Sequence, residues 1–386
     1  MSSIPVTVVG PRSSGKTVYL ASLFARLSQQ DPELGFSVSV PLSQSQRLNH
    51  IYEQAVGPGD WPLPNFLADS PTWDFTCKVR TAQRRVLHPF AVSYADYAGE
   101  LLTNGDEQSE AFQRVESLVR TSPFLLILLD GEKVLRFLAG DPRLLNELWP
   151  ILNCVNDNVA GVVHIVVTKW DLLVAAGHTL ADVADGLRGS GGFRNFVDAR
   201  RDFQDGSGIV RLIPVSSVGL DFARLDENGI VVKTPGARAV PLNVELPFMA
   251  IVVDLFTTSL RQFAKAREDG SLPVSRSLER QRRVLQGVSG TLPLVKAFLR
   301  LRVAKAPVLQ SLGEDVLGAF AAYVADRERS VGKRIEEDAA ALRQAVAQAT
   351  TDQEVMARIA KAFQARLEEF EDEYPGSRLD LWGASE

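Results

Sequence analysis

Short runs of β-branched and aliphatic residues alternate with segments of helical periodicity from the start of the chain to about residue 255. Residues 109–120 and 141–155 carry apolar side chains at helical spacing. Strands are predicted at Ile4–Val9, Trp73–Arg80, Pro89–Ala95, Phe124–Asp130, Val162–Val167 and Ile209–Val215. This alternation is typical of an α/β fold with a doubly wound, mostly parallel sheet.

The stretch from residue 76 to residue 94, TCKVRTAQRRVLHPFAVSY, departs from that alternation. It has the pattern of two strands joined by a polar turn, which predicts an antiparallel pair. We therefore expect a hairpin at one edge of the otherwise parallel sheet.

The pattern changes after about Asp254, where glycine and β-branched runs become sparse and the periodicity is helical throughout. Thr351 followed by Glu354 matches a capping box at the start of a helix. The apolar positions of that helix are Val355, Ile359, Phe363 and Leu367. We predict two domains, an α/β domain over residues 1–255 and a helical domain over residues 256–386.

The overall composition excludes several classes of protein. A chain of 386 residues that is 45% hydrophobic and 23% charged has an ordinary globular composition. The net charge of −5 argues against binding nucleic acid over the whole surface, and the sequence contains no DNA- or RNA-binding motif. The strongest apolar run, Phe124–Leu129, is too short for a transmembrane segment, and the first residues lack a signal-peptide pattern. Because Cys77 and Cys154 form no CxxC motif, a reducing, cytoplasmic location is expected.

Charge is distributed unevenly in the C-terminal third. Residues 276–305 are strongly basic, whereas the segment that begins at Glu368 reads EEFEDE. A basic helical surface could contact anionic lipid or an acidic protein partner. The favoured interpretation is a solvated face that the acidic segment partly compensates, so peripheral membrane contact is not expected.

The segment GPRSSGKT, residues 10–17, lies between a predicted strand and a predicted helix and matches G-x-x-x-x-G-K-[ST] in full. In this motif the glycines let backbone N–H groups converge on phosphate oxygens. The lysine reaches the β- and γ-phosphates, which makes it a catalytic group, and the threonine hydroxyl ligates Mg²⁺. The predicted phosphate-binding residues are Gly10, Ser13, Ser14, Gly15, Lys16, Thr17 and Val18.

Three further loops follow predicted strands at their carboxyl ends, where open α/β sheets bind ligands. They are DYAGE at residues 96–100, TKWD at residues 168–171 and SSVG at residues 216–219. Three such loops in this order are more specific than any one of them alone.

Together these loops resemble those of the Ras-like P-loop GTPases, and the resemblance covers about the first 255 residues. It implies a D-x-x-G motif at Asp96 and Gly99, in which Asp96 contacts Mg²⁺ through water and the Gly99 N–H senses the γ-phosphate. It also implies an [NT]-K-x-D motif at Thr168, Lys169 and Asp171, which would bind the base.

A carboxylate at Asp171 can accept hydrogen bonds from both the ring N–H and the exocyclic amine of guanine, whereas adenine offers no such pair. The aliphatic stem of Lys169 would lie along the base. The resemblance further implies that the backbone of Ser216 and Ser217 contacts the guanine carbonyl. GTP or GDP with Mg²⁺ is therefore the expected ligand.

Two positions depart from a minimal member of this family. The resemblance implies a Mg²⁺-binding threonine before the hairpin, and Thr72 is the candidate, with a solvated loop threonine as an equal alternative. Glu100 occupies the position where the family usually has a glutamine that orients the attacking water. Its carboxylate can still accept a hydrogen bond from that water, but its charge beside the γ-phosphate predicts slow hydrolysis. Arg12 is a weak internal candidate for a compensating cation.

The D-x-x-G-E form and the segment PLNVELPF resemble the bacterial double-GTPase-like proteins of conflict-associated systems. The sequence therefore predicts a slow GTPase that acts as a molecular switch, with nucleotide-dependent loops coupled to C-terminal helices that bind a protein partner. Two alternatives stay open: a P-loop scaffold that binds nucleotide without cycling, and a P-loop ATPase in which the TKWD sequence is incidental.

Overall fold

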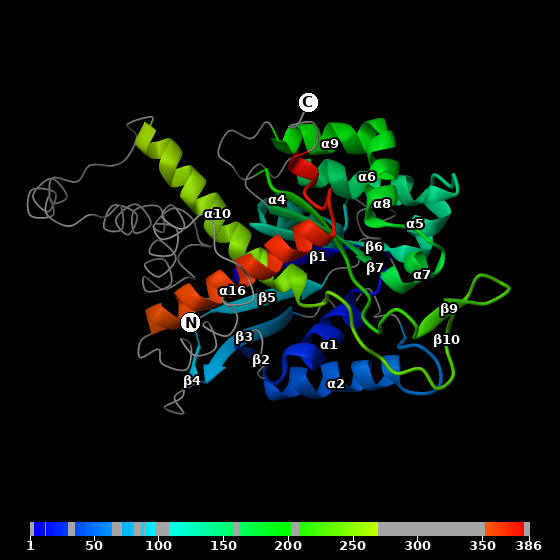
Figure 1. Ribbon diagram of the computed structural model, residues 1–386. Helices are drawn as coiled ribbons and strands as arrows, with labels where there is room; N and C mark the ends of the chain where they lie inside the picture. The colour runs from blue at the N-terminus through cyan, green and yellow to red at the C-terminus, as the bar shows by residue number, and fades with distance from the viewer. Residues whose placement is uncertain are drawn as a thin grey trace, which may run out of the picture.

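The computed structural model describes residues 4–11, 13–29, 35–63, 72–80, 86–88, 90–96, 108–156, 162–201, 208–268 and 352–381. A twisted central sheet has helices on both faces (Figure 1). Its strand order is β2-β3-β5-β1-β6-β7-β8, with β4 paired to β3. The strands are β1 (Ile4–Val9), β2 (Ser37–Ser39), β3 (Thr72–Arg80), β4 (Val86–Leu87), β5 (Ala91–Asp96), β6 (Phe124–Asp130), β7 (Val162–Thr168) and β8 (Val210–Pro214).

The sheet is parallel from β5 to β8 and antiparallel at the other edge. β1 pairs in parallel with β5 and β6, and β7 and β8 continue in the same direction. β3 runs antiparallel to β5, and the short strand β2, which the sequence did not predict, extends this edge beyond β3. The predicted α/β fold class with an antiparallel edge is confirmed.

The central strands are buried on both faces, which explains why their sequences are apolar without alternation. Every residue of β6 is buried. Leu126 and Leu128 belong to the hydrophobic core on one face of the sheet, and Leu125, Ile127 and Leu129 belong to the core on the other.

Each face has its own set of helices. The first core includes residues of α1 (Lys16–Leu27), α2 (Leu42–Val56), α10 (Leu246–Glu268) and α16 (Asp352–Glu373). The second includes residues of α4 (Glu110–Thr121), α5 (Gly131–Leu138), α6 (Arg143–Asn156), α7 (Trp170–Ala175), α8 (Leu180–Gly189) and α9 (Gly191–Arg201). Among the described residues, no helix is long and apolar enough to cross a membrane.

α16 packs along α10 and shares the first core of the sheet. Its residues in this core are Ile359, Phe363, Leu367 and Phe370. The ring of Phe363 lies 5.0 Å from that of Phe36, measured between centroids. Residue 255 falls inside α10, and residues 269–351, including Thr351 of the predicted capping box, lie outside the described residues. The domain division at residue 255 therefore stays a prediction.

The segment after α16 covers the outer edge of β8. The Leu212 N–H donates to the Ser377 carbonyl at 2.7 Å. The Val210 N–H donates to Oδ1 of Asp380 at 3.2 Å. Asp380 lies in the 3₁₀ turn η1 (Leu379–Leu381), the last element of the described residues. These bonds satisfy backbone groups of an edge strand, so residues 377–380 cover part of the edge of the sheet.

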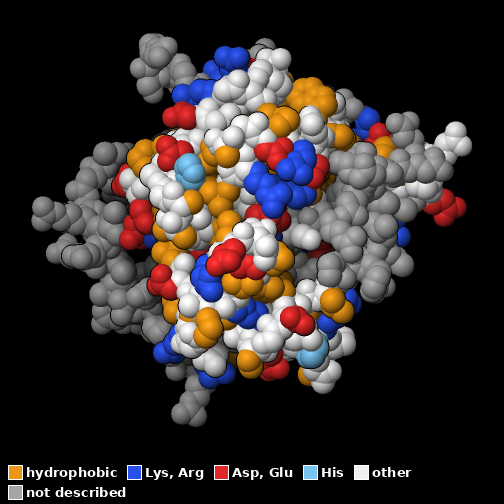
Figure 2. All heavy atoms as spheres, turned by 90° about the vertical axis from the view of Figure 1, so that its right-hand side faces the viewer, with side chains coloured by type: hydrophobic (Ala, Val, Ile, Leu, Met, Phe, Trp, Pro, Cys, Tyr) orange, Lys and Arg blue, Asp and Glu red, His pale blue; other side chains and the backbone are white. Residues whose placement is uncertain are grey.

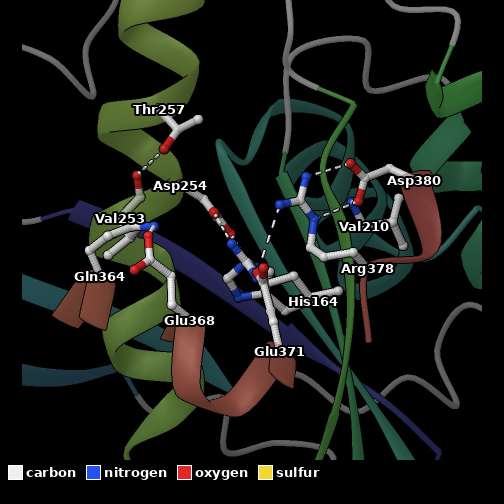
Figure 3. A network of polar contacts seen from close by, with 11 residues as sticks. His164, Val210, Val253, Asp254, Thr257, Gln364, Glu368, Glu371, Arg378 and Asp380 are labelled. Atoms are coloured by element: carbon white, nitrogen blue, oxygen red, sulfur yellow. Dashed lines mark hydrogen bonds and ion pairs between the residues drawn. The ribbon is translucent and has the colours of Figure 1, made fainter. Parts of the chain in front are cut away.

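A buried ion-pair network joins the C-terminal elements to the sheet (Figure 3). Arg211 of β8 donates from Nε to Oδ2 of Asp254 at 2.6 Å and from Nη2 to Oδ1 at 2.7 Å. The same carboxylate lies 2.8 Å from Nε2 of His164, and Arg211 also pairs with Glu371 of α16. Burial alone would raise the pKa of Asp254, but the Arg211 guanidinium and the hydrogen bonds hold it well below its ordinary value.

Replacing Asp254 by asparagine is expected to lower the free energy of unfolding by about 3–5 kcal/mol, because it removes the buried counter-charge of Arg211 and leaves only the more exposed Glu371 carboxylate. Asp254 and Arg211 are 1% and 4% exposed, so water cannot compensate for the loss. Urea-induced unfolding measures this difference.

The matched control is Asp185→Asn, which removes an ion pair to Arg188 whose carboxylate side chain is 72% exposed. That substitution should change the free energy of unfolding by less than about 1 kcal/mol. Equal unfolding midpoints for the two variants would contradict a structural role for the buried pair.

Candidate functional site

The loop between β1 and α1, predicted to bind phosphate, has an unusual backbone. Gly15 (φ +78°) and Ser13 (φ +65°) adopt left-handed backbone conformations, and Gly15 precedes the first turn of α1 without a side-chain cap. A Cβ added at Gly10 would lie 2.6 Å from the Leu128 carbonyl oxygen, so only glycine fits against β6 there. The positive end of the helix dipole favours an anion at such a helix start, and a phosphate is a suitable one.

The Lys16 ammonium lies over this loop. Its Nζ donates to the carbonyls of Gly10 at 2.8 Å and Pro11 at 3.1 Å, and to the Ser14 hydroxyl at 3.4 Å. These contacts place a positive charge at the mouth of the loop, where the charge of a bound phosphate would lie. The half-buried Val18 continues the first turn of α1.

Thr17 and Asp96 come together from distant parts of the sequence. The Thr17 hydroxyl donates to Oδ2 of Asp96 at 3.0 Å. Burial raises the pKa of Asp96, although Lys16, Thr17 and the charge of Arg47 act in the opposite direction. Mg²⁺ prefers hard oxygen ligands such as a hydroxyl and a carboxylate. Since these two oxygens are neighbours, Thr17 and Asp96 fit the predicted metal site.

The other residues predicted near the γ-phosphate are only partly described. Thr72 is the exposed first residue of β3 and pairs with Ala95, the neighbour of Asp96. Its carbonyl accepts a hydrogen bond from Nε2 of Gln44 at 3.0 Å. Gly99 and Glu100 lie outside the described residues.

The TKWD loop is tied to the phosphate loop by one hydroxyl. Oγ1 of Thr168 lies 2.8 Å from the Ser14 carbonyl and 2.9 Å from the Leu129 carbonyl, at the end of β6. Lys169 follows with φ +50°, and its Nζ pairs with Oδ2 of Asp130 at 2.8 Å. This turn brings the phosphate loop and the carboxyl ends of β6 and β7 into direct contact.

Asp171 and Ser216, predicted from separate motifs, also meet. The Ser216 hydroxyl donates to Oδ1 of Asp171 at 2.7 Å, and the same hydroxyl accepts the Gly219 N–H at 2.9 Å. Asp171 is 2% exposed, and burial raises its pKa to about 6 despite the Ser216 hydrogen bond. The Ser217 carbonyl accepts a hydrogen bond from the Ser22 hydroxyl of α1 at 2.9 Å, which fixes the SSVG loop to the helix.

The sequence analysis did not identify Asp130 and Gly131 as site residues. Asp130 pairs with Lys169 and also accepts the Glu132 N–H at 3.0 Å, at the start of α5. A Cβ added at Gly131 would lie 2.4 Å from the Thr168 carbonyl oxygen. The available signal was an Asp-Gly pair directly after the most apolar strand, at the edge where the other loops lie.

Figure 2 shows the side of the molecule that carries α5, α7 and the hairpin of β9 (Ala223–Leu225) and β10 (Val231–Lys233). Acidic and basic side chains lie beside one another on the coloured part of this face, with hydrophobic side chains between them. No group of three or more metal-ligating His, Cys, Asp or Glu side chains occurs among the described residues.

No protein-family model and no curated protein matches the sequence. Among solved structures, the chain is similar to an Era variant from Aquifex aeolicus bound to GDP and AlF₄⁻, at 12% identity and a TM-score of 0.27, over 67% of this chain and 68% of that one. It is also similar to the GTPase-like domain of Ski7 from S. cerevisiae. The form bound to GTP shows 16% identity and a TM-score of 0.32, over 66% and 51% of the two chains.

The Ski7 domain bound to GDP and inorganic phosphate gives 18% identity and a TM-score of 0.31, over 62% of this chain and 48% of that chain. The chain thus spans about half the length of the Ski7 structures it matches. Identities and TM-scores this low do not show a shared function, so the function has to be inferred from the site itself.

Replacing Gly131 by alanine is expected to lower the free energy of unfolding by about 1–3 kcal/mol, because the added methyl group would collide with the carbonyls of Thr168 and Lys169. Thermal or urea unfolding measures the change. The matched control is Gly191→Ala, since Gly191 is also the first residue of a helix but has no atom within 4 Å of the added Cβ. If Gly131→Ala were as stable as Gly191→Ala, the backbone around Gly131 would be able to shift to accommodate a methyl group, and the predicted close approach would be wrong.

Proposed function

We propose that this protein binds GTP with Mg²⁺ and hydrolyses it slowly to GDP and phosphate, as a nucleotide-dependent switch. The observation that carries the proposal is the buried Asp171 carboxylate, held by Ser216 and linked through Thr168 to the phosphate loop. The predicted phosphate loop and the predicted hydrogen-bond acceptor for the base would therefore belong to one connected site.

Base selection would depend on the hydrogen-bonding direction at Asp171. Its ionised carboxylate only accepts hydrogen bonds, and Ser216 uses one lone pair of Oδ1. Guanine presents two adjacent donors to the remaining positions, whereas adenine presents a ring acceptor that the carboxylate would repel. The backbone of Ser216 and Ser217 would contact the guanine carbonyl, and the Lys169 stem would lie along the ring.

Phosphate binding would use the N–H groups from Ser13 to Val18 and the Lys16 ammonium. To reach a bound phosphate, Nζ of Lys16 would exchange its carbonyl contacts to Gly10 and Pro11 for phosphate oxygens. Thr17 and Asp96 would hold Mg²⁺, which neutralises charge on the β- and γ-phosphates when bound. Thr72 remains a proposed third ligand.

Turnover and signalling would involve residues next to Asp96. The Gly99 N–H would bind the γ-phosphate, and Glu100 would accept a hydrogen bond from the attacking water, slowly because its own charge opposes the phosphate. Loss of the γ-phosphate would release these loops. We propose that α10 and α16 carry this change to a protein partner.

The decisive test is competition of GTP and ATP for a fluorescent guanine nucleotide bound to the wild type and to Asp171→Ala. GTP should displace the probe at least about 100-fold better than ATP. The variant should lose most of that preference, because without the Asp171 carboxylate the site has no acceptor for the two N–H donors of guanine. Equal competition by ATP in both proteins would instead indicate an ATP-binding protein.

A second measurement separates the switch from a static scaffold. Phosphate release with excess GTP should continue beyond one equivalent per protein molecule. Nucleotide binding with no release, even over many hours, would favour a scaffold whose ligand only stabilises the fold.

GDP affinity is expected to fall by about tenfold between pH 7.5 and pH 5, because Asp171 accepts guanine hydrogen bonds only when ionised. Its pKa of about 6 means that most molecules are protonated at pH 5. By linkage, the nucleotide-free protein should lose stability as the pH rises from about 4 to 6, since the folded state holds this proton more tightly than the unfolded state.

Isothermal titration with GDP at each pH measures the effect, and Asp171→Asn is the control, because titration of the phosphates themselves affects both proteins equally. If the variant and the wild type showed the same pH dependence, Asp171 would not be the titrating group.

A further inference from the structure

Arg47 of α2 lies beside the predicted γ-phosphate site although no motif includes it. Its guanidinium carbon is 5.3 Å from the centre of the Trp73 ring, a cation–π contact. Trp73 is 1% exposed, whereas Arg47 is exposed, so the ring forms a fixed platform beneath a solvent-accessible cation. No carboxylate among the described residues forms an ion pair with Arg47.

The register of the sheet places this platform next to Asp96. Trp73 pairs directly with Tyr94, and both side chains belong to the same hydrophobic core. Because side chains alternate along a strand, Asp96 projects on the same face as Tyr94. Trp73 and Asp96 are then diagonal neighbours, a relation that separates two residues by about 7–8 Å. Arg47, together with Lys16, acts electrostatically on Asp96.

The helix that carries Arg47 is held at both ends. Near its start, Gln44 accepts the Asp74 N–H at 2.9 Å and donates to the Thr72 carbonyl at 3.0 Å. At its other end, Nζ of Lys233 donates to the Gln54 carbonyl at 2.7 Å and lies 4.9 Å from the centre of the Trp61 ring. Because α2 is held at two points, it already places Arg47 near Trp73. No conformational entropy has to be lost to order this helix in each round of hydrolysis.

Glu100 creates the need for such a cation. In the proposed function this carboxylate, which follows Asp96 by four residues in the sequence, adds negative charge near a highly charged γ-phosphate. A guanidinium can offset the charge of the carboxylate and of the γ-phosphate, since its planar set of N–H donors matches the oxygens of both groups.

Resting on the proposed function, we propose that Arg47 is the cation that this chain itself supplies to the γ-phosphate of GTP. During hydrolysis the water oxygen bonds to the γ-phosphorus while the bond to the β,γ-bridging oxygen breaks. The bridging oxygen leaves with GDP, and the water's protons pass to the released phosphate and to solvent. Arg47 swings from the Trp73 face onto the γ-phosphate oxygens and stabilises the charge that develops there.

The test compares Arg47→Ala and Arg47→Lys with the wild type and with Gln46→Ala, an exposed neutral neighbour on the same helix. Single-turnover GTP hydrolysis should slow by about 100-fold or more in Arg47→Ala, while GDP affinity changes less than about threefold. Arg47→Lys should recover part of the rate, because a point charge remains without the two-pronged geometry. Gln46→Ala should hydrolyse GTP like the wild type.

Hydrolysis of GTP by Arg47→Ala within about threefold of the wild-type rate would overturn the proposal. A second readout applies if turnover is too slow to follow: aluminium fluoride should tighten GDP binding in the wild type and not in Arg47→Ala, and equal tightening would also overturn it. A wild type that binds no guanine nucleotide would instead refute the proposed function, which the GDP titration shows separately.

Discussion

The Thr168 hydroxyl is the contact on which the geometry of the candidate site depends. It lies within hydrogen-bonding distance of one carbonyl in the phosphate loop and another at the end of β6, and its own residue ends β7. Three neighbouring segments of the carboxyl edge are therefore fixed relative to one another by a group that is 2% exposed. Buried hydrogen bonds of this kind are costly to leave unmade, so the loops cannot drift apart independently.

This link gives the two halves of the site different characters. On the side proposed for the base, Asp171 and Ser216 are buried and hydrogen-bonded to each other, and Ser22 of α1 holds the next residue, Ser217. On the γ-phosphate side, Thr72 and Arg47 are exposed, and their positions depend on α2. Under the proposed function, this difference would let the protein hold the base firmly while the region around the γ-phosphate responds to the loss of one phosphate.

The central strands were predictable because burial on both faces leaves a continuous apolar run. β1 and β6 begin and end at the residues that the sequence indicated. β2 was missed because three residues are too few to show a period. α2 was missed for a different reason: its described buried residues are only Leu48 and Ala55, and distant side chains such as Lys233 hold it in place.

The pairs that make up the site followed from topology, since the ends of parallel strands converge. Thr17 meets Asp96, and Asp171 meets Ser216, as expected for loops at one edge. Asp130 lies at the same edge and its Asp-Gly pair was the available signal, whereas Arg47 could not be predicted in this way, because no sequence spacing specifies its contact with Trp73.

The covering of β8 by residues 377–380 has a consequence for synthesis of the chain. The strands of the main sheet all precede α10 in the chain, yet residues 377–380, which bond to the outer edge of β8, are made only after α16. At ordinary rates of translation that delay is on the order of ten seconds. During that time the N–H groups of Val210 and Leu212 lack the partners that Asp380 and Ser377 supply, and unpaired groups on a strand edge favour pairing with other chains.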